Sequence, residues 1–86
     1  MFPIYQADIA RMRESGHTFA SVKLEPVKHR GETWYELHLF AEGKADAWVL
    51  VAQKGHPRRF RLEAATDFVA VHLPEITKAC ITISRE

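Results

Sequence analysis

The chain has 86 residues, of which 47% are hydrophobic and 27% charged, a composition typical of a folded domain rather than a disordered segment. This length predicts a single domain, residues 1–86, with one core. Twelve Lys and Arg residues against eleven Asp and Glu residues give a net charge of +1, which excludes a protein drawn to nucleic acid or to a membrane by its overall charge.

The cysteine count and the first residues of the sequence bear on the compartment. Cys80 is the single cysteine, which excludes an intramolecular disulfide and a zinc site built from cysteines. Residues 1–8 lack the basic start and apolar core of a secretion signal, and no apolar run approaches the roughly 20 residues of a membrane span. We therefore expect a soluble, cytoplasmic protein without a membrane partner.

The first predicted element is an amphipathic helix from Met1 to Gly16. Pro3 suits a first helical turn, where its missing N–H is not needed. A buried stripe is expected from the apolar residues at three- and four-residue spacing, which are Tyr5, Ile9 and Met12.

Three strands are predicted next, as an antiparallel meander. Residues 17–28 alternate with period two and end near Pro26, and residues 33–41 and 45–51 flank a turn that contains Gly43. The alternation assigns to one face of the sheet the side chains of Ala20, Val22, Leu24, Tyr35, Leu37, Leu39, Ala41, Ala47, Val49 and Val51.

A second helix and a last strand complete the prediction. Residues 62–73 have helical periodicity and stop before Pro74, and residues 79–84 alternate again, with Ile81 and Ile83 facing the core. The expected fold class is α+β, in the order αβββαβ, with two helices on one face of a four-stranded mixed sheet. The crossover helix returns the last strand beside the first, which gives the strand order 3-2-1-4 with strands 1 and 4 parallel.

The helix-free face of this sheet is the main candidate site. Its apolar and aromatic residues are expected to form an interface: Phe19, Trp34, His38, Phe40, Trp48 and Leu50. An exposed apolar patch of this kind marks an interaction surface, and two-fold self-association is the commonest form of oligomer. The alternatives are a face covered within the monomer by long side chains, and a platform on which bases stack.

A basic loop is the second candidate. Four cations, Lys54, Arg58, Arg59 and Arg61, occur in it without an acid, and two more, Lys28 and Arg30, belong to the turn after the first predicted strand. The topology is expected to bring both segments to the same end of the sheet, where they would contact phosphates without reading sequence. The alternative is a set of solvated loop charges that pair with neighbouring acids.

Catalysis has little support in the sequence. The five histidines do not occur at the spacing of a known ligand motif, and the four glycines are isolated, so no phosphate-binding loop is present. Glu36 and His38 share a strand face, but one such pair would leave a metal shell incomplete. We therefore expect no enzyme activity, no cofactor and no metal.

Residues 57–83 resemble a known group of proteins. A short basic and aromatic segment leads into a Leu-x-Ala-Ala-x-x-Phe helix and then a final strand, and the match is carried by Phe60, Leu62, Ala64, Ala65 and Phe68. This pattern is similar to the C-terminal half of small partition-associated and accessory proteins of bacterial plasmids and integrative elements. The resemblance implies an accessory role near DNA-maintenance machinery, through protein contacts.

The leading hypothesis is a non-enzymatic interaction module that forms a homodimer through the aromatic sheet face. Its expected setting is a nucleoprotein complex of a plasmid or other mobile element, with a further protein partner there. The alternative hypothesis is direct binding of nucleic acid by the basic loop, residues 54–61, together with the sheet face.

Overall fold

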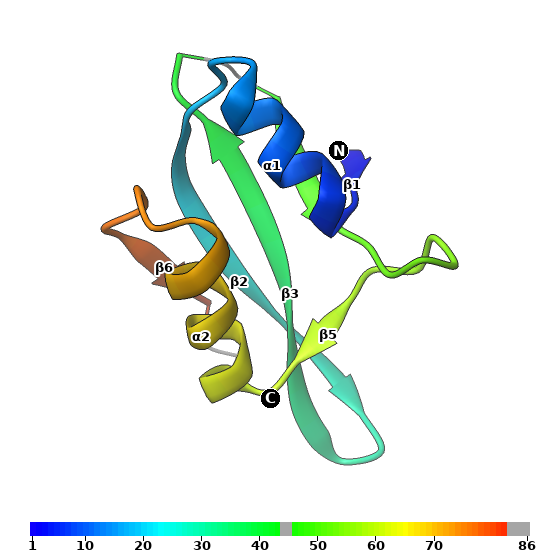
Figure 1. Ribbon diagram of the computed structural model, residues 1–86. Coiled ribbons are helices and arrows are strands. Elements are labelled where there is room, and N and C mark those ends of the chain that lie inside the picture. Colours follow the sequence, from blue (N-terminus) through cyan, green and yellow to red (C-terminus); the bar gives the residue numbers. More distant parts are fainter. Residues whose placement is uncertain (44–45, 83–86) are drawn as a thin grey trace.

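The computed structural model describes residues 1–43 and 46–82. The elements follow one another along the chain (Figure 1) as β1 (Phe2–Ile4), α1 (Gln6–Glu14), β2 (Phe19–His29), β3 (Glu32–Ala41), β4 (Ala47–Leu50), β5 (Arg59–Phe60), α2 (Leu62–His72) and β6 (Ala79–Ile81). Neither helix in this part of the chain has the length and apolar character needed to cross a lipid bilayer.

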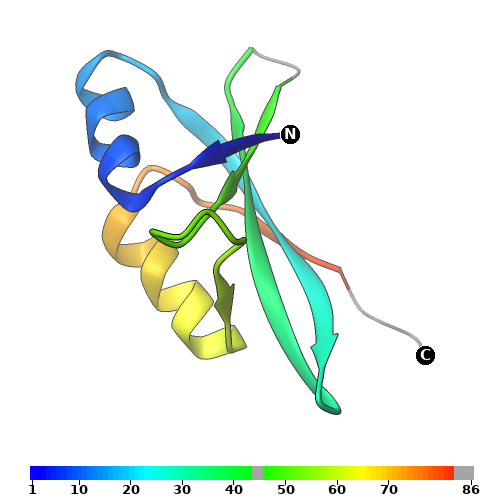
Figure 2. The same cartoon turned by 90° about the vertical axis from the view of Figure 1, so that its right-hand side faces the viewer.

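The α+β class, the two helices and the mixed sheet are confirmed, but the element order and the strand count are not. The sheet has six strands instead of four, in the order β1-β4-β3-β2-β6, with β5 pairing with β3. The predicted strand order 3-2-1-4 corresponds to the observed order β4-β3-β2-β6 within this sheet. As expected, β2 and β6 are parallel. Both helices lie on one side of the sheet (Figure 2).

The helix predicted over residues 1–16 is wrong at its start. Phe2–Ile4 form the edge strand β1, parallel to β4, with Pro3 beside Val49. An edge strand tolerates proline because it does not need every N–H group for pairing. Tyr5 is the N-cap residue of α1 and is exposed, so the buried side of this helix consists of Ile9 and, in part, Met12.

A two-residue turn fixes the register of the long β2–β3 hairpin. Arg30 and Gly31 both have positive φ, 52° and 78°, between the paired residues His29 and Glu32. A turn with two positive φ angles matches the right-handed twist of paired strands. The resulting register puts Val22 opposite Leu39 and Leu24 opposite Leu37, and all four are almost fully buried against the helices.

A β-bulge at the start of β2 overturns the expected position of Phe19. Phe19 pairs with Ala41 and Ser21 pairs with Phe40, so Ala20 is an extra residue in β2. The bulge shifts the alternation by one residue. Phe19 therefore enters the core, where it is 1% exposed, and Ala20 is exposed.

The alternation of β4 is also opposite to the prediction. Trp48 pairs with Leu39, which places Trp48 and Leu50 on the helix-covered side and Val49 on the other side. The Trp48 ring meets Phe19 edge-on, with 6.0 Å between the ring centroids. Since every residue from Ala47 to Leu50 is apolar, hydrophobicity alone could not assign the two faces.

The second helix and the last strand complete the helix-covered layer. In α2, Ala65, Phe68 and Val69 are buried, whereas Leu62 is exposed. Arg61 is the N-cap residue and forms no side-chain capping bond, as its residue type leads one to expect. In β6, Ile81 is 46% exposed and not in the core, and the predicted core residue Ile83 lies outside the described residues.

Candidate functional site

The side of the sheet that carries no helix has a central surface built from β2 and β3. Side chains alternate along each strand, so the neighbours of the buried core residues point to this side. We call these eight half-buried residues the open face: Ser21, Lys23, Glu25 and Val27 on β2, and Trp34, Glu36, His38 and Phe40 on β3.

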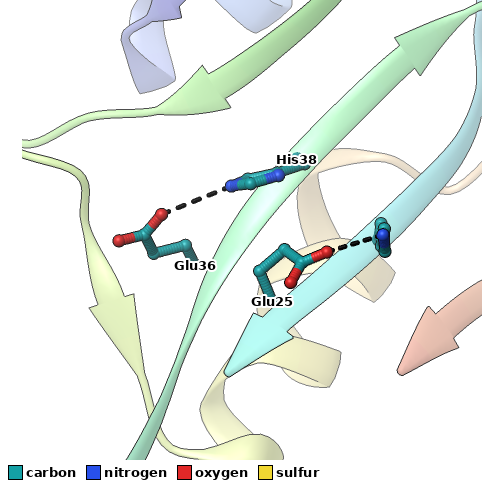
Figure 3. Close-up of polar contacts among 4 residues, drawn as sticks. Glu25, Glu36 and His38 are labelled. Carbon is teal, nitrogen blue, oxygen red and sulfur yellow. Dashed lines mark hydrogen bonds and ion pairs between the residues drawn. The ribbon is translucent and has the colours of Figure 1, made fainter. Parts of the chain in front are cut away.

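Charged residues occupy the middle of the open face in two rows. Lys23 lies opposite His38, which forms a basic row, and Glu25 lies opposite Glu36, which forms an acidic row. Each base contacts the acid on its own strand. Lys23 Nζ is 2.6 Å from Glu25 Oε1, and His38 Nε2 is 3.3 Å from Glu36 Oε1 (Figure 3).

The ionisation of Glu25 depends on this arrangement. The Lys23 ammonium donates a hydrogen bond to the Glu25 carboxylate and holds the pKa of Glu25 below its ordinary value of 4.5. Partial burial opposes that shift, and the charge of His38 adds to it. The charged form of Glu25 is thus stabilised mainly by Lys23 of the same strand.

Aromatic residues lie at the two ends of β3 on the open face, Trp34 beyond the acidic row and Phe40 beyond the basic row. The Arg61 guanidinium lies over the Trp34 ring, 4.8 Å from its centroid, and also pairs with Glu32, 3.2 Å away. The Trp34 Nε1 atom is buried and donates to no other group in the described residues. Trp34 therefore has one ring face covered by a cation and an N–H group that lacks an acceptor.

The structure divides the six residues expected at the interface into two groups. Trp34, His38 and Phe40 lie on the open face, as predicted. Phe19, Trp48 and Leu50 lie on the helix-covered side, so a partner at the open face could not reach them. Sequence reasoning missed Val27, which the alternation of β2 would have supplied had it been continued past Pro26.

The six cations assigned to the basic patch do not gather on one surface. Arg58 turns to the helix-covered side and contacts Gln6, whereas Arg59 pairs opposite Glu36 and points to the open face. In Figure 1 the loop after β4, which carries Lys54, projects to the side at about the middle of the molecule, whereas the end of the β2–β3 hairpin, with Lys28 on β2 and Arg30 in the turn, lies at the bottom of the view. The expectation that these segments share one end of the sheet is therefore wrong.

The Glu36–His38 pair remains a two-residue contact. In the described residues, no group of three or more His, Cys, Asp or Glu side chains is close enough to hold a metal ion.

Comparison with protein-family models, with curated proteins and with solved structures finds no match to this chain.

Proposed function

We propose that the protein is a non-enzymatic interaction module that forms a homodimer by stacking two open faces. The observation that carries this proposal is the order of residue types along β3: the aromatic Trp34, the acid Glu36, the base His38 and the aromatic Phe40. The facing positions of β2 repeat the order of charges, with Val27, Glu25, Lys23 and Ser21.

This order is self-complementary under a two-fold axis. The axis would run between the two charged rows, in the plane of the interface and across the strands. It reverses the direction of the strands in the second copy, so that Lys23 faces the partner's Glu25 and His38 faces the partner's Glu36. The same operation puts Trp34 against the partner's Phe40, so one patch serves both subunits, as a two-fold interface requires.

Electrostatics within one subunit also favours a partner of this kind. Like charges directly opposite each other on neighbouring strands are unfavourable; Glu25 and Glu36 form such a pair, and Lys23 and His38 form a second one whenever the imidazole is protonated. A stacked second copy gives each of these four residues a facing residue of the opposite type, acid against base. Since desolvating charges offsets much of that attraction, we expect the aromatic ends to supply the affinity and the rows to set the register.

Sedimentation equilibrium of the full chain tests the proposal. We expect the wild type to show a monomer–dimer equilibrium, and Phe40→Asp to shift it to monomer because a carboxylate would replace the ring that meets the partner's Trp34. The matched control is Val71→Asp on α2, at a side chain that is 71% exposed on the other side of the sheet. A wild type that is monomeric at all concentrations, or equal association of the two variants, would contradict the dimer.

The wider setting of this module follows from the resemblance of residues 57–83 alone. It suggests an accessory role in a nucleoprotein complex of a plasmid or other mobile element. Direct nucleic-acid binding has less support, because the cations are divided between two sides of the sheet. It would appear as a shift of labelled DNA that weakens steeply with salt and that needs Arg59 and Arg61.

A further inference from the structure

A cleft of about 730 Å³ lies on the helix-covered side, between the start of α1, the loop after β4 and the end of α2. Its volume is within the range of roughly 300–1,000 Å³ that small-molecule sites occupy. Much of its wall is apolar or aromatic, from Tyr5, Ala7, Ala10, Val51 and Ala52. Its polar wall consists of Gln6, Gln53, Arg58 and His72.

Arg58 is the charged group of the cleft, and its guanidinium is held in place. It lies over two rings of the core, 4.8 Å from the Phe60 centroid and 5.4 Å from the Phe68 centroid. Its Nη1 atom donates a hydrogen bond to Gln6 Oε1 at 3.1 Å. Since two rings and an amide fix the guanidinium, a ligand would not have to order it.

Arg58 lacks the carboxylate partner that Arg13 and Arg61 have. Arg13 pairs with Glu75 at 3.0 Å and Arg61 pairs with Glu32 at 3.2 Å. For Arg58, no carboxylate within residues 1–43 and 46–82 lies within 4.0 Å. A guanidinium offers five N–H donors in a planar fork that fits a carboxylate or a phosphate, and here one donor goes to a neutral amide.

Gln6 and His72, two other polar groups of the cleft, are also held by contacts between distant segments. Gln6 Nε2 lies 3.4 Å from His72 Nε2, and the His72 ring packs against Phe68 with 4.4 Å between centroids. Arg13 donates a hydrogen bond to the main-chain carbonyl of His72 at 3.3 Å. The polar wall thus joins side chains of both helices and of the segment before β5 in one preformed arrangement.

We propose that this cleft binds a small organic anion, whose carboxylate or phosphate group pairs with Arg58 and whose apolar body lies against Tyr5 and Ala10. A charged hydrogen bond of this kind, in a site with apolar walls, gives the orientation typical of ligand pockets. The cleft lies on the opposite side of the sheet from the open face. Ligand binding and dimer formation are therefore separate proposals.

Titration of the ¹⁵N-labelled full chain, followed by the amide resonances, tests this site. The probes are benzoate, phenyl phosphate and their neutral analogue benzamide. We expect at least one anionic probe to shift the amides of Gln6, Ala7, Ala52 and Gln53, with an affinity about tenfold or more above that of benzamide, as loss of a charged hydrogen bond predicts. The anion that binds more tightly identifies the preferred group, carboxylate or phosphate.

Two variants and a control assign the effect to Arg58. Arg58→Met keeps an apolar stem over the two rings, and we expect it to lower the affinity for the anion about tenfold or more. Arg59→Met removes the adjacent charge on the other side of the sheet and should leave the affinity unchanged. Gln6→Glu supplies an internal carboxylate next to Arg58, so it should abolish binding even if Arg58→Met fails to fold.

The proposal is overturned if neither anion shifts these amides, or if benzamide binds as well as both anions do. Equal affinity in wild type and Gln6→Glu, or an equal loss in Arg59→Met and Arg58→Met, would also overturn it. These readouts do not depend on the oligomeric state, so failure of the dimer and failure of the anion site are distinguishable.

Discussion

Glu25 on β2 lies directly opposite Glu36 on β3. Two residues away on each strand, Lys23 lies opposite His38. Opposed like charges are normally avoided in paired strands because they destabilise the sheet. In one subunit, the contacts along each strand compensate for this arrangement, at 2.6 Å for Lys23–Glu25 and 3.3 Å for His38–Glu36. The same four residues give the surface its two-fold complementarity.

The charged rows predict a charge-reversal experiment. Lys23→Glu and Glu25→Lys should each weaken the dimer, because each places like charges face to face across the two-fold axis. The double variant Lys23→Glu with Glu25→Lys should recover most of the lost affinity, since each altered residue again faces an opposite charge. Sedimentation equilibrium at low and moderate salt measures all three.

The double variant is the decisive comparison in that experiment. If it associates no better than the single variants, the register set by the two-fold axis is wrong even if the protein dimerises. The uncharged variant Lys23→Met provides a control for loss of the contact within one subunit, because it adds no repulsion across the interface.

Phe19 and Phe40 should differ in their effects on folding. Phe19→Ala empties a fully buried position beside Trp48 and should lower the free energy of unfolding by about 3–5 kcal/mol. Phe40→Ala, at a half-buried position of the open face, should cost clearly less. Urea denaturation at a concentration that favours monomer measures both, and equal losses would contradict the bulge that turns Phe19 into the core.

The contact between Arg61 and Trp34 should make a modest contribution to stability. Arg61→Met removes the guanidinium from the indole ring and from Glu32 but keeps an apolar stem. We expect a loss of about 0.5–1 kcal/mol, because both contacts are partly exposed to solvent. Thermal or urea denaturation measures this loss. The control Arg59→Met removes an exposed cation from β5 and should lower the free energy of unfolding by less.

Acid should remove the contribution of Glu25 to stability. Its pKa is lower in the folded protein than the ordinary value of 4.5, because Lys23 donates a hydrogen bond to the charged form. The stabilisation is therefore present above pH 4.5 and is lost as the pH falls through the lower folded value. Comparing urea midpoints above and below this window should show a smaller acid-induced decrease for Glu25→Gln than for wild type.

The long, regular elements could be predicted from the sequence, and the short ones could not. Periodicity and Pro74 gave α2, and the strict alternation of β3 put Trp34, His38 and Phe40 on the open face. Phe2–Ile4 and Arg59–Phe60 are too short to show a period, and they form strands because β4 and β3 provide partners. Pairing with β4 therefore outweighed the helical preference that the sequence around Pro3 had indicated.

The cleft needed the folded chain for a different reason. Gln6 is 52 residues from Arg58 and 66 from His72, and no local pattern links them. Sequence reasoning counted Arg58 with its neighbours as a loop cation. The alternation around β5 separates it from Arg59 and Arg61, because Arg58 and Phe60 share one side of the strand.

The extra residue in β2 has a consequence for tolerance to deletion. A strand that loses one residue normally exchanges its inner and outer side chains on one side of the lesion. Ala20 is the exception, since a chain that lacks it would run from Phe19 to Ser21 with the same partners, Ala41 and Phe40, already in place. Shortening β2 by this alanine would straighten the strand and leave every ring on its present side.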